Sequence, residues 1–350
     1  MTTEKRSLMK KGILLLLIGL SVFLVYLYFF VGITGLTDIA AELQTANLFY
    51  YSLAFVSIIL SMLFSSLVWH RLLNLLSIKA PFRKAFLYFW IGTFVDILVP
   101  AESVSGDISK VYLLSKNSGV NSGKVVASVV SHRILYMTVS LGGLIIGSIY
   151  FVLKYRPPEL ILNFILVIAS CTAFLIVLLG YLCFREQTTK KIVNWVISLA
   201  ARISRGRWEL TSLRSKAQKM LEAFHRGINI LARNPRGLTW PVVFSMIAWL
   251  FHFLVAFLVF ASVGFKISPS AIIIVYSINI SLQGVPSGIP GQVGFMEIVM
   301  TNLYMLLGVP VDISVAATVL TRIITLWFRL VVGYAIVQWI GIKALRGSTR

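Results

Sequence analysis

Long apolar runs separated by short polar segments make up most of the chain. Six of these runs hold about the 20 residues that a helix needs to cross a bilayer. They cover approximately residues 12–34, 48–69, 124–151, 160–183, 239–263 and 313–341. Two further apolar regions, 85–118 and 270–308, are interrupted by Pro, Gly and Ser. The pattern predicts an all-α polytopic membrane protein with about six full spans and two broken or re-entrant helical hairpins.

The composition leads to the same fold class. The chain has 350 residues, of which 58% are hydrophobic, and its mean hydropathy is +0.89. A soluble protein of this length could not cover so much apolar surface. We therefore expect residues 1–350 to form a single, multi-pass integral domain in the cell (plasma) membrane.

The positive charge of the chain is unevenly distributed between the two sides of the predicted bundle. The formal net charge is +20. With the N-terminal end placed in the cytoplasm, only three of the 32 Lys and Arg residues fall outside and three lie within spans. The other 26 lie on the cytoplasmic side. This bias predicts that both the N-terminus and the C-terminus are cytoplasmic.

Residues 185–237 form the one long polar segment, with 12 Lys and Arg and three acidic residues. Two amphipathic helical patterns occur in it, separated at 202–207. Basic amphipathic helices of this kind lie on the anionic cytoplasmic leaflet. A solvated loop that only fixes the orientation of the chain is the alternative. No aromatic-interleaved basic groove or metal-binding knuckle accompanies the charge, so nucleic acid is not an expected partner.

Residues 97–134 and 286–323 repeat one pattern at an offset of 189 or 190 residues. Each copy has a Pro in a Gly/Ser-rich break, an acidic residue, a Gly-Val pair and an Arg inside a long apolar helix. The residues are Pro100, Asp107, Gly119 and Arg133 in the first copy and Pro290, Glu297, Gly308 and Arg322 in the second. The predicted topology makes the two copies open from opposite sides of the membrane. Repeat one (about 48–183) and repeat two (about 239–342) therefore form an inverted repeat, which is typical of transporters.

The charged residues inside apolar segments indicate a binding site. A charge at the bilayer centre costs at least about 2.5–3.5 kcal/mol, so retained charges are expected to face one another or water. Arg133 and Arg322 each lie about ten residues into a span, near the midplane. Two arginines at that depth, one from each repeat, predict a site for an anion.

The breaks at Pro100 and at Pro290 and Gly291 support the same hypothesis. A helix that restarts after a break presents free N–H groups and the positive end of its dipole. Asp107 and Glu297 lie in the first turns of the restarted helices and are candidates to cap them or to pair with the arginines. The predicted site further includes Glu102, Lys110 and Arg329.

A purely structural interpretation of these residues is also possible. The arginine–acid pairs would then lock the two halves of the protein together, and the Pro/Gly breaks would be packing kinks. The presence of two symmetric sets favours the binding site over this alternative.

Signatures of enzymes are missing from the sequence. It has no phosphate-binding P-loop, no zinc-protease or serine-hydrolase motif, and no Asp-x-Asp motif. Cys171 and Cys183 are expected to be buried thiols and not a metal pair. We expect no catalytic residue, no metal site and no cofactor.

The two repeated motifs resemble the flippase-like membrane domain of the lysylphosphatidylglycerol synthase family. The first motif of that family has Gly-Glu followed by Arg, where this chain has Gly106, Asp107 and Lys110. The second has Pro-Gly-Gly-x-Gly with a Glu soon after, where this chain has Pro290, Gly291, Gln292, Gly294 and Glu297. The resemblance covers about residues 10–342, and it includes no aminoacyl-transferase domain.

The resemblance implies a flippase-like lipid translocase. It would move a polar or anionic phospholipid, or a polyprenyl-phosphate-type lipid, between leaflets through a central site between the inverted repeats. The enzyme alternative is an integral lipid-glycan or lipid-phosphate transferase that uses Asp107 and Glu297 as acid and base. The structural alternative is a non-transporting subunit of a lipid-modifying complex. A partner enzyme or a homo-oligomer is a further possibility.

Overall fold

A computed structural model describes residues 44–99, 104–155, 159–203, 210–283 and 288–347, with Ser21 and Val25. The described segments fold into α-helices, with one short 3-10 turn and one π-helical turn. The elements are α2 (Leu48–Leu75), α3 (Phe82–Leu98), α4 (Val104–Ser118), α5 (Ser122–Tyr155), α6 (Glu159–Phe184), α7 (Glu186–Ile203), α8 (Leu210–Ala232), α9 (Thr239–Ser262), α10 (Pro269–Gln283), η1 (Pro290–Gln292), α11 (Phe295–Leu306), α12 (Val311–Arg322), η2 (Ile323–Phe328) and α13 (Arg329–Gly347).

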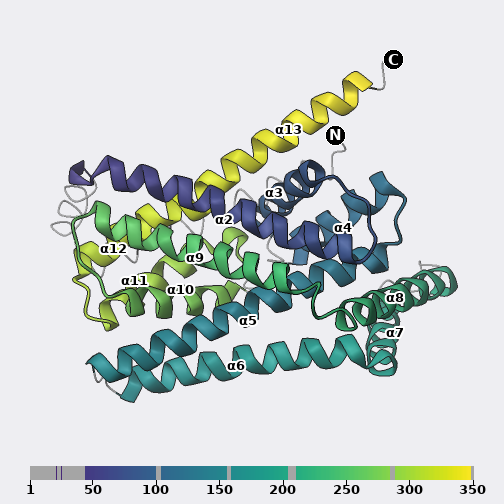
Figure 1. Cartoon of the computed structure of the whole chain (residues 1–350), viewed down its shortest axis with the longest axis horizontal. Helices are drawn as coiled ribbons and strands as arrows, with labels where there is room; N and C mark the ends of the chain where they lie inside the picture. Colours follow the sequence, from purple (N-terminus) through teal and green to yellow (C-terminus); the bar gives the residue numbers. More distant parts are fainter. Residues whose placement is uncertain are drawn as a thin grey trace.

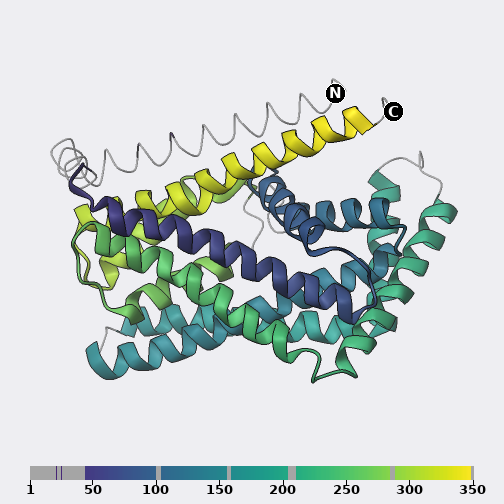
Figure 2. The same ribbon diagram turned by 45° about the horizontal axis from the view of Figure 1, so that its top comes forward.

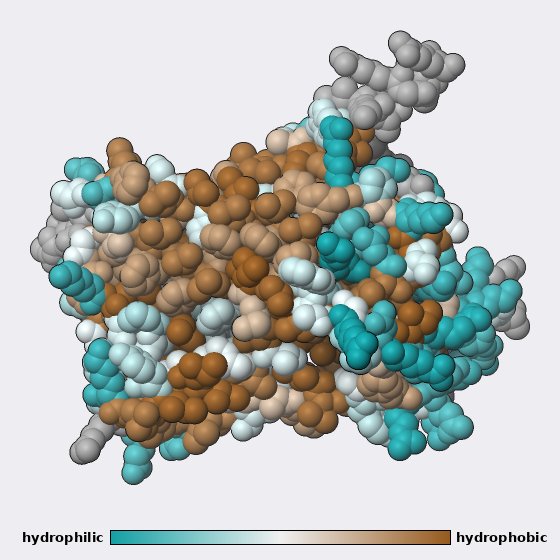
Figure 3. All heavy atoms as spheres, viewed as in Figure 1, coloured by the Kyte–Doolittle hydropathy of each residue, from teal (hydrophilic) through white to brown (hydrophobic). Residues whose placement is uncertain are grey.

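Five helical segments in the described part are long and apolar enough to cross a membrane. They are Leu48–Leu75, Ser122–Tyr155, Ile161–Phe184, Thr239–Ser262 and Val311–Ile340. These match five of the six predicted spans, while the predicted span 12–34 lies outside the described residues except for Ser21 and Val25. Figure 3 shows an apolar surface over the middle of the bundle and hydrophilic side chains gathered toward one end. The protein is a polytopic membrane protein.

The long helices run roughly along the longest axis of the molecule (Figure 1). Helices α2 and α9 pack closely, because serine side chains leave room for the two backbones to approach. Ser57 Oγ donates to the carbonyl of Phe251 at 2.6 Å, and Ser61 Oγ donates to that of Ala248 at 2.9 Å. These bonds satisfy the hydroxyl groups inside the bundle and hold its centre together.

Both interrupted regions fold into pairs of short helices. Helices α3 and α4 lie toward the end of the bundle that carries α7 and α8, while α10 and α11 lie toward the opposite end (Figures 1 and 2). The interruptions approach each other in the interior, where Ile97 at the end of α3 packs with Val293 and Leu326. A Cβ atom built on Gly291 would lie 3.4 Å from Ile97 Cγ2. The chain therefore brings its two breaks together.

The basic segment forms the two predicted helices, α7 and α8. Helix α7 crosses the end of the bundle at a steep angle to α6 (Figure 1) and leaves Ile192, Trp195, Val196 and Leu199 exposed. Helix α8 instead buries its apolar face against the bundle. The two amphipathic helices thus cover different surfaces, although their compositions are alike.

One expectation about the cysteines is wrong. Cys183 is buried, but Cys171 is exposed on α6. Only 11% of the apolar window of α6 is buried inside the protein. An apolar side chain on such a helix faces lipid rather than a protein core, so hydrophobic sequence alone does not predict burial.

Candidate functional site

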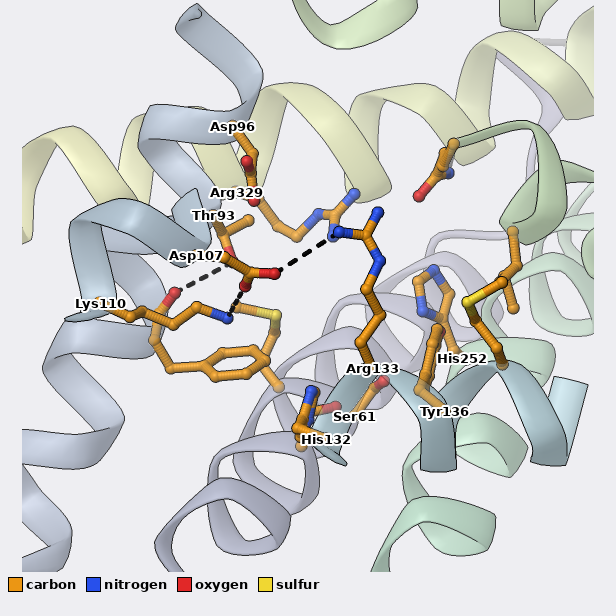
Figure 4. A pocket seen from close by; sticks show the side chains of 16 residues that line it. Ser61, Thr93, Asp96, Asp107, Lys110, His132, Arg133, Tyr136, His252 and Arg329 are labelled. Carbon is orange, nitrogen blue, oxygen red and sulfur yellow. Dashed lines mark hydrogen bonds and ion pairs between the residues drawn. The ribbon is translucent and has the colours of Figure 1, made fainter. Parts of the chain in front are cut away.

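A polar cavity of about 200 Å³ lies inside the bundle, between helices from both interrupted regions. Its charged and imidazole side chains come from α3, α4, α5, α9 and α13. They are Asp96, Asp107, Lys110, His132, Arg133, His252 and Arg329. Figure 4 shows these groups pointing into one space. Charged side chains around a cavity in a membrane bundle are typical of a substrate or ion pathway.

Asp107 joins α4 to α5 at this cavity. One carboxylate oxygen lies 2.6 Å from Lys110 Nζ, and the other lies 3.6 Å from Arg133 Nη1. Asp107 and Lys110 are three residues apart on α4 and therefore share a helix face. The Lys110 ammonium also lies 4.9 Å from the centre of the Phe89 ring, a cation–π contact. Lys110 is thus held on two sides, whereas the ion pair that Arg133 makes among the described residues is the long contact with Asp107.

Asp96 closes the first interruption. It lies near the end of α3 and accepts hydrogen bonds from the first turn of α4: 3.0 Å from Ser105 Oγ and 2.6 Å from the Gly106 N–H. This carboxylate satisfies N–H and O–H donors that the start of a helix leaves free. The residue at 106 must be glycine, because a Cβ atom there would overlap the Asp96 carboxylate and the carbonyl of Gly92.

The second interruption is built around Glu297 and Arg322. Arg322 Nε donates to Glu297 Oε1 at 2.6 Å, and Arg322 Nη2 donates to the Gly291 carbonyl at 2.6 Å. The other Glu297 oxygen accepts the N–H of Gly294 at 2.7 Å, so it caps α11. The sequence predicted that Glu297 would either cap the helix or pair with an arginine. In the structure Glu297 does both. The backbone turns here with positive φ at Gly291 (58°) and at Gly294 (86°).

A π-helical turn, η2, separates Arg322 from Arg329. Arg329 Nε donates to the carbonyl of Thr325. Within the described residues Arg329 makes no ion pair with a carboxylate, although it lines the polar cavity together with Arg133 (Figure 4). π-helical turns of this kind often occur at functional sites.

A second cavity of about 140 Å³ adjoins the first. Gly291, Gln292 and Arg322 line the second cavity but not the first. Both cavities are lined by Thr93, Asp96, Gln283 and Arg329. Arg133 and Arg322 therefore do not share one cavity, and Arg329 stands between the two half-sites.

The predicted site residues fall into three groups. Arg133, Asp107, Lys110 and Arg329 come together at the first cavity, while Arg322 and Gly291 line the second. Pro290 and Glu297 are buried beside the second cavity. Pro100 and Glu102 lie outside the described residues.

Several residues that line the first cavity were not among the predicted site residues. They are Ser61, Thr93, Asp96, His132, Tyr136, His252 and Gln283. Three of them carry a signal in the sequence, because Asp96, His132 and His252 are polar or charged residues within apolar segments. In the described segments no group of three or more His, Cys, Asp or Glu side chains is placed to hold a metal ion.

A known family accounts for nearly all of the chain. The family model for the lysylphosphatidylglycerol synthase TM region matches residues 16–333. The chain belongs to this family. The resemblance predicted from the two motifs is thereby confirmed, and the lysylphosphatidylglycerol synthase TM region covers both interrupted regions and both cavities.

Archaeal relatives align over almost their full length. A UPF0104 membrane protein of Methanocaldococcus jannaschii is 27% identical over 337 residues, which cover 94% of this chain and 95% of that protein. A UPF0104 membrane protein of Pyrococcus horikoshii is 24% identical over 328 residues, covering 92% and 95% respectively. One from Methanothermobacter thermautotrophicus is 25% identical over 333 residues, covering 95% and 96%. The family membership and these relatives support a multi-pass membrane protein.

Proposed function

We propose that the protein is a lipid translocase that moves a lipid with an anionic or phosphate headgroup between the two leaflets. The headgroup would bind in the polar cavity between Arg133 and Arg329, while the hydrocarbon chain stays in the surrounding lipid. Phospholipids and polyprenyl-phosphate-type lipids both carry such a headgroup.

The charge balance of the cavity supports an anionic ligand. Its described lining holds three cations, Lys110, Arg133 and Arg329, against two carboxylates, Asp96 and Asp107. One positive charge is therefore in excess inside a membrane bundle, where an unpaired charge is costly. A phosphate group would neutralise it, and the planar guanidinium groups would bind two phosphate oxygens each. This excess charge is the observation that carries the proposal.

The arrangement of the elements is consistent with an inverted repeat. The α3–α4 and α10–α11 hairpins approach from opposite ends, and α5 runs in the opposite direction to α12, η2 and α13 (Figure 1). Gly119 after α4 and Gly308 after α11 both have positive φ, 63° and 89°. In transporters built this way, one repeat rocks against the other around a site near the midplane. We propose the same motion here, with both hairpins as re-entrant elements and both termini in the cytoplasm.

The basic segment 185–237 indicates which end of the bundle would face the cytoplasm. Helix α7 carries exposed apolar side chains, among them Trp195, next to Lys190 and Lys191. This combination fits a helix that lies in the headgroup region of the anionic cytoplasmic leaflet. The end of the bundle with α7 and α8 would then face the cytoplasm.

A leaflet assay in proteoliposomes tests the proposal. Fluorescent phosphatidylglycerol, a fluorescent polyprenyl phosphate and fluorescent phosphatidylcholine are compared for wild type and Arg133→Gln. Loss of one charge-assisted hydrogen bond, worth about 1.5–3 kcal/mol, should slow transfer of the anionic lipids roughly 10- to 100-fold. Lys191→Gln, an equal charge change on the exposed side of α7, should leave the rate unchanged.

The same vesicles distinguish the alternatives. Equal transfer rates for wild type and for Arg133→Gln would overturn the central binding site, and equal rates for wild type and for empty vesicles would overturn the translocase. Chemical conversion of the extracted lipid would indicate a transferase that uses Asp107 and Glu297. If wild type neither transfers nor chemically converts the lipids, the non-transporting subunit is the alternative that remains.

A further inference from the structure

A separate apolar cavity of about 330 Å³ lies at the junction of α5, α6, α7 and α8. Its lining is aliphatic or aromatic except for one Thr and one Cys: Val126, Val130, Leu179, Leu182, Cys183, Thr189, Val193, Ala217, Met220, Leu221 and Phe224. It shares no lining residue with the polar cavity. The two cavities are therefore separate spaces.

The lining offers nothing to a water molecule. The Thr189 hydroxyl already donates to the carbonyl of Leu182 at 2.8 Å and to that of Arg185 at 3.1 Å. A buried water needs two to four polar partners, and an apolar cavity of about 150 Å³ stays dry and takes up benzene. A cavity of twice that size, with walls of the same kind, is suited to a segment of hydrocarbon chain.

The edge of the cavity carries positive charge. Arg214 lies on the same face of α8 as Ala217 and Leu221, because residues three and seven apart align on a helix. Its Nη2 donates to Ser198 Oγ of α7 at 3.1 Å, so the guanidinium bridges the two helices beside the cavity. Met220, which lines the cavity, is itself 41% exposed and marks the open side.

The positive charge of α7 and α8 favours a lipid with an anionic headgroup. Their described side chains include six cations against two carboxylates, Glu186 and Glu222. The cations are Lys190, Lys191, Arg214, Lys216, Lys219 and Arg226. Amphipathic basic helices at a membrane surface attract anionic phospholipids, and a guanidinium binds phosphate oxygens in pairs.

We infer that this junction binds one anionic phospholipid as a resident ligand. One acyl chain occupies the cavity between α5, α6, α7 and α8, and the phosphate lies against Arg214. The exposed apolar face of α7, which includes Trp195 and Val196, holds the helix in the leaflet that supplies the lipid. This lipid is distinct from any lipid that passes through the central cavity.

Native mass spectrometry of the delipidated full chain tests the inference. Dioleoyl phosphatidylglycerol and dioleoyl phosphatidylcholine are added separately, in the Arg133→Gln background, so that the central site is weakened. Phosphatidylglycerol should bind with a stoichiometry of one and at least tenfold more tightly than phosphatidylcholine. Arg214→Gln should remove most of that preference, whereas Lys216→Gln on the exposed side of α8 should keep it.

Variants that fill the apolar cavity provide the second part of the test. Ala217→Trp should abolish the bound phosphatidylglycerol, while Ala232→Trp, on the exposed end of α8, should not. If Ala217→Trp does not fold, Val193→Phe fills the same space from α7. Equal binding by a folded filling variant and by Ala232→Trp would overturn the inference, as would equal affinity for the two lipids. Neither result bears on transfer through the central cavity.

Discussion

Arg322 Nε donates to Glu297 Oε1 at 2.6 Å, and both side chains are only 6% exposed. Arg322 Nη2 also donates to the Gly291 carbonyl, and the second Glu297 oxygen accepts the Gly294 N–H. Arg322 therefore braces the second interruption instead of presenting a free guanidinium to a ligand. The two arginines that the repeat aligns, Arg133 and Arg322, have different surroundings, and it is Arg329 that lines the polar cavity with Arg133.

Removal of Arg322 is expected to destabilise the fold. Arg322→Met leaves Glu297 as a buried, unpaired charge, and breaking such a pair costs about 3–5 kcal/mol. The thermal unfolding midpoint in detergent should fall markedly. Glu297→Gln combined with Arg322→Met should be less destabilised than Arg322→Met alone, because no buried charge is left. An unchanged midpoint for Arg322→Met would contradict the bracing role.

Removal of Arg329 should affect transport more than stability. Arg329 makes no ion pair with a carboxylate in the described structure, so Arg329→Gln leaves no described carboxylate without its cation. It reduces the excess charge of the cavity lining from one to zero. We expect roughly 10- to 100-fold slower transfer of anionic lipids, with the unfolding midpoint close to wild type. The comparison with Arg322→Met in the same assays separates a ligand-binding arginine from a bracing one.

Arg329→Lys refines this prediction. It keeps the charge but loses the planar fork that binds two oxygens at once. Transfer should therefore be intermediate between wild type and Arg329→Gln. Equal rates for all three proteins would exclude Arg329 from the binding site.

The close approach at Gly106 gives a test of the first interruption. Gly106→Ala forces its new methyl group into the Asp96 carboxylate and the Gly92 carbonyl, so α3 and α4 must separate. Gly142→Ala on α5 is the matched control, because a Cβ atom there meets nothing within 4 Å. In a helix that control should be neutral or stabilise by about 0.5–1 kcal/mol. Thermal unfolding of both variants should show a clear loss only for Gly106→Ala.

Much of the fold could be predicted from the sequence because length and hydropathy alone determine a membrane span. Five spans, the two amphipathic helices and the break at Gly291 follow from such local signals. The contact between Asp96 and Gly106 could not be predicted, because it depends on how closely α3 approaches α4. The sequence shows the Asp96 carboxylate within an apolar run, but it does not show that Gly106 is its partner.

The positions of the arginines show a second limit. Arg322 and Arg329 are seven residues apart, which places them on one face of a regular α-helix. The π-helical turn η2 lies between them, and each π turn holds more residues than an α turn. Arg322 then contacts Glu297, while Arg329 lines the cavity with Arg133. The sequence of Ile323–Phe328 contains no signal from which this π-helical turn could be predicted.

The proposed orientation depends on which side of the membrane the ends of the bundle face. Lys216 on α8 and Lys266, between α9 and α10, are both exposed. Helix α8 and the connection between α9 and α10 lie toward opposite ends of the bundle (Figure 1). Each lysine can be replaced by a single reactive thiol once Cys171 and Cys183 have been removed. The exposed Cys171 would otherwise react as well.

In this background, Lys266→Cys should react with a membrane-impermeant maleimide in intact cells. Lys216→Cys should react only after the membrane is permeabilised, because the proposed orientation places the positive end of the bundle in the cytoplasm. The parent protein without cysteine gives the background, and reaction of both variants after solubilisation shows that both thiols are accessible. Reversed labelling would place α7 and α8 outside. Labelling of both thiols in intact cells would place them on one side, and the two hairpins would then no longer open toward opposite faces.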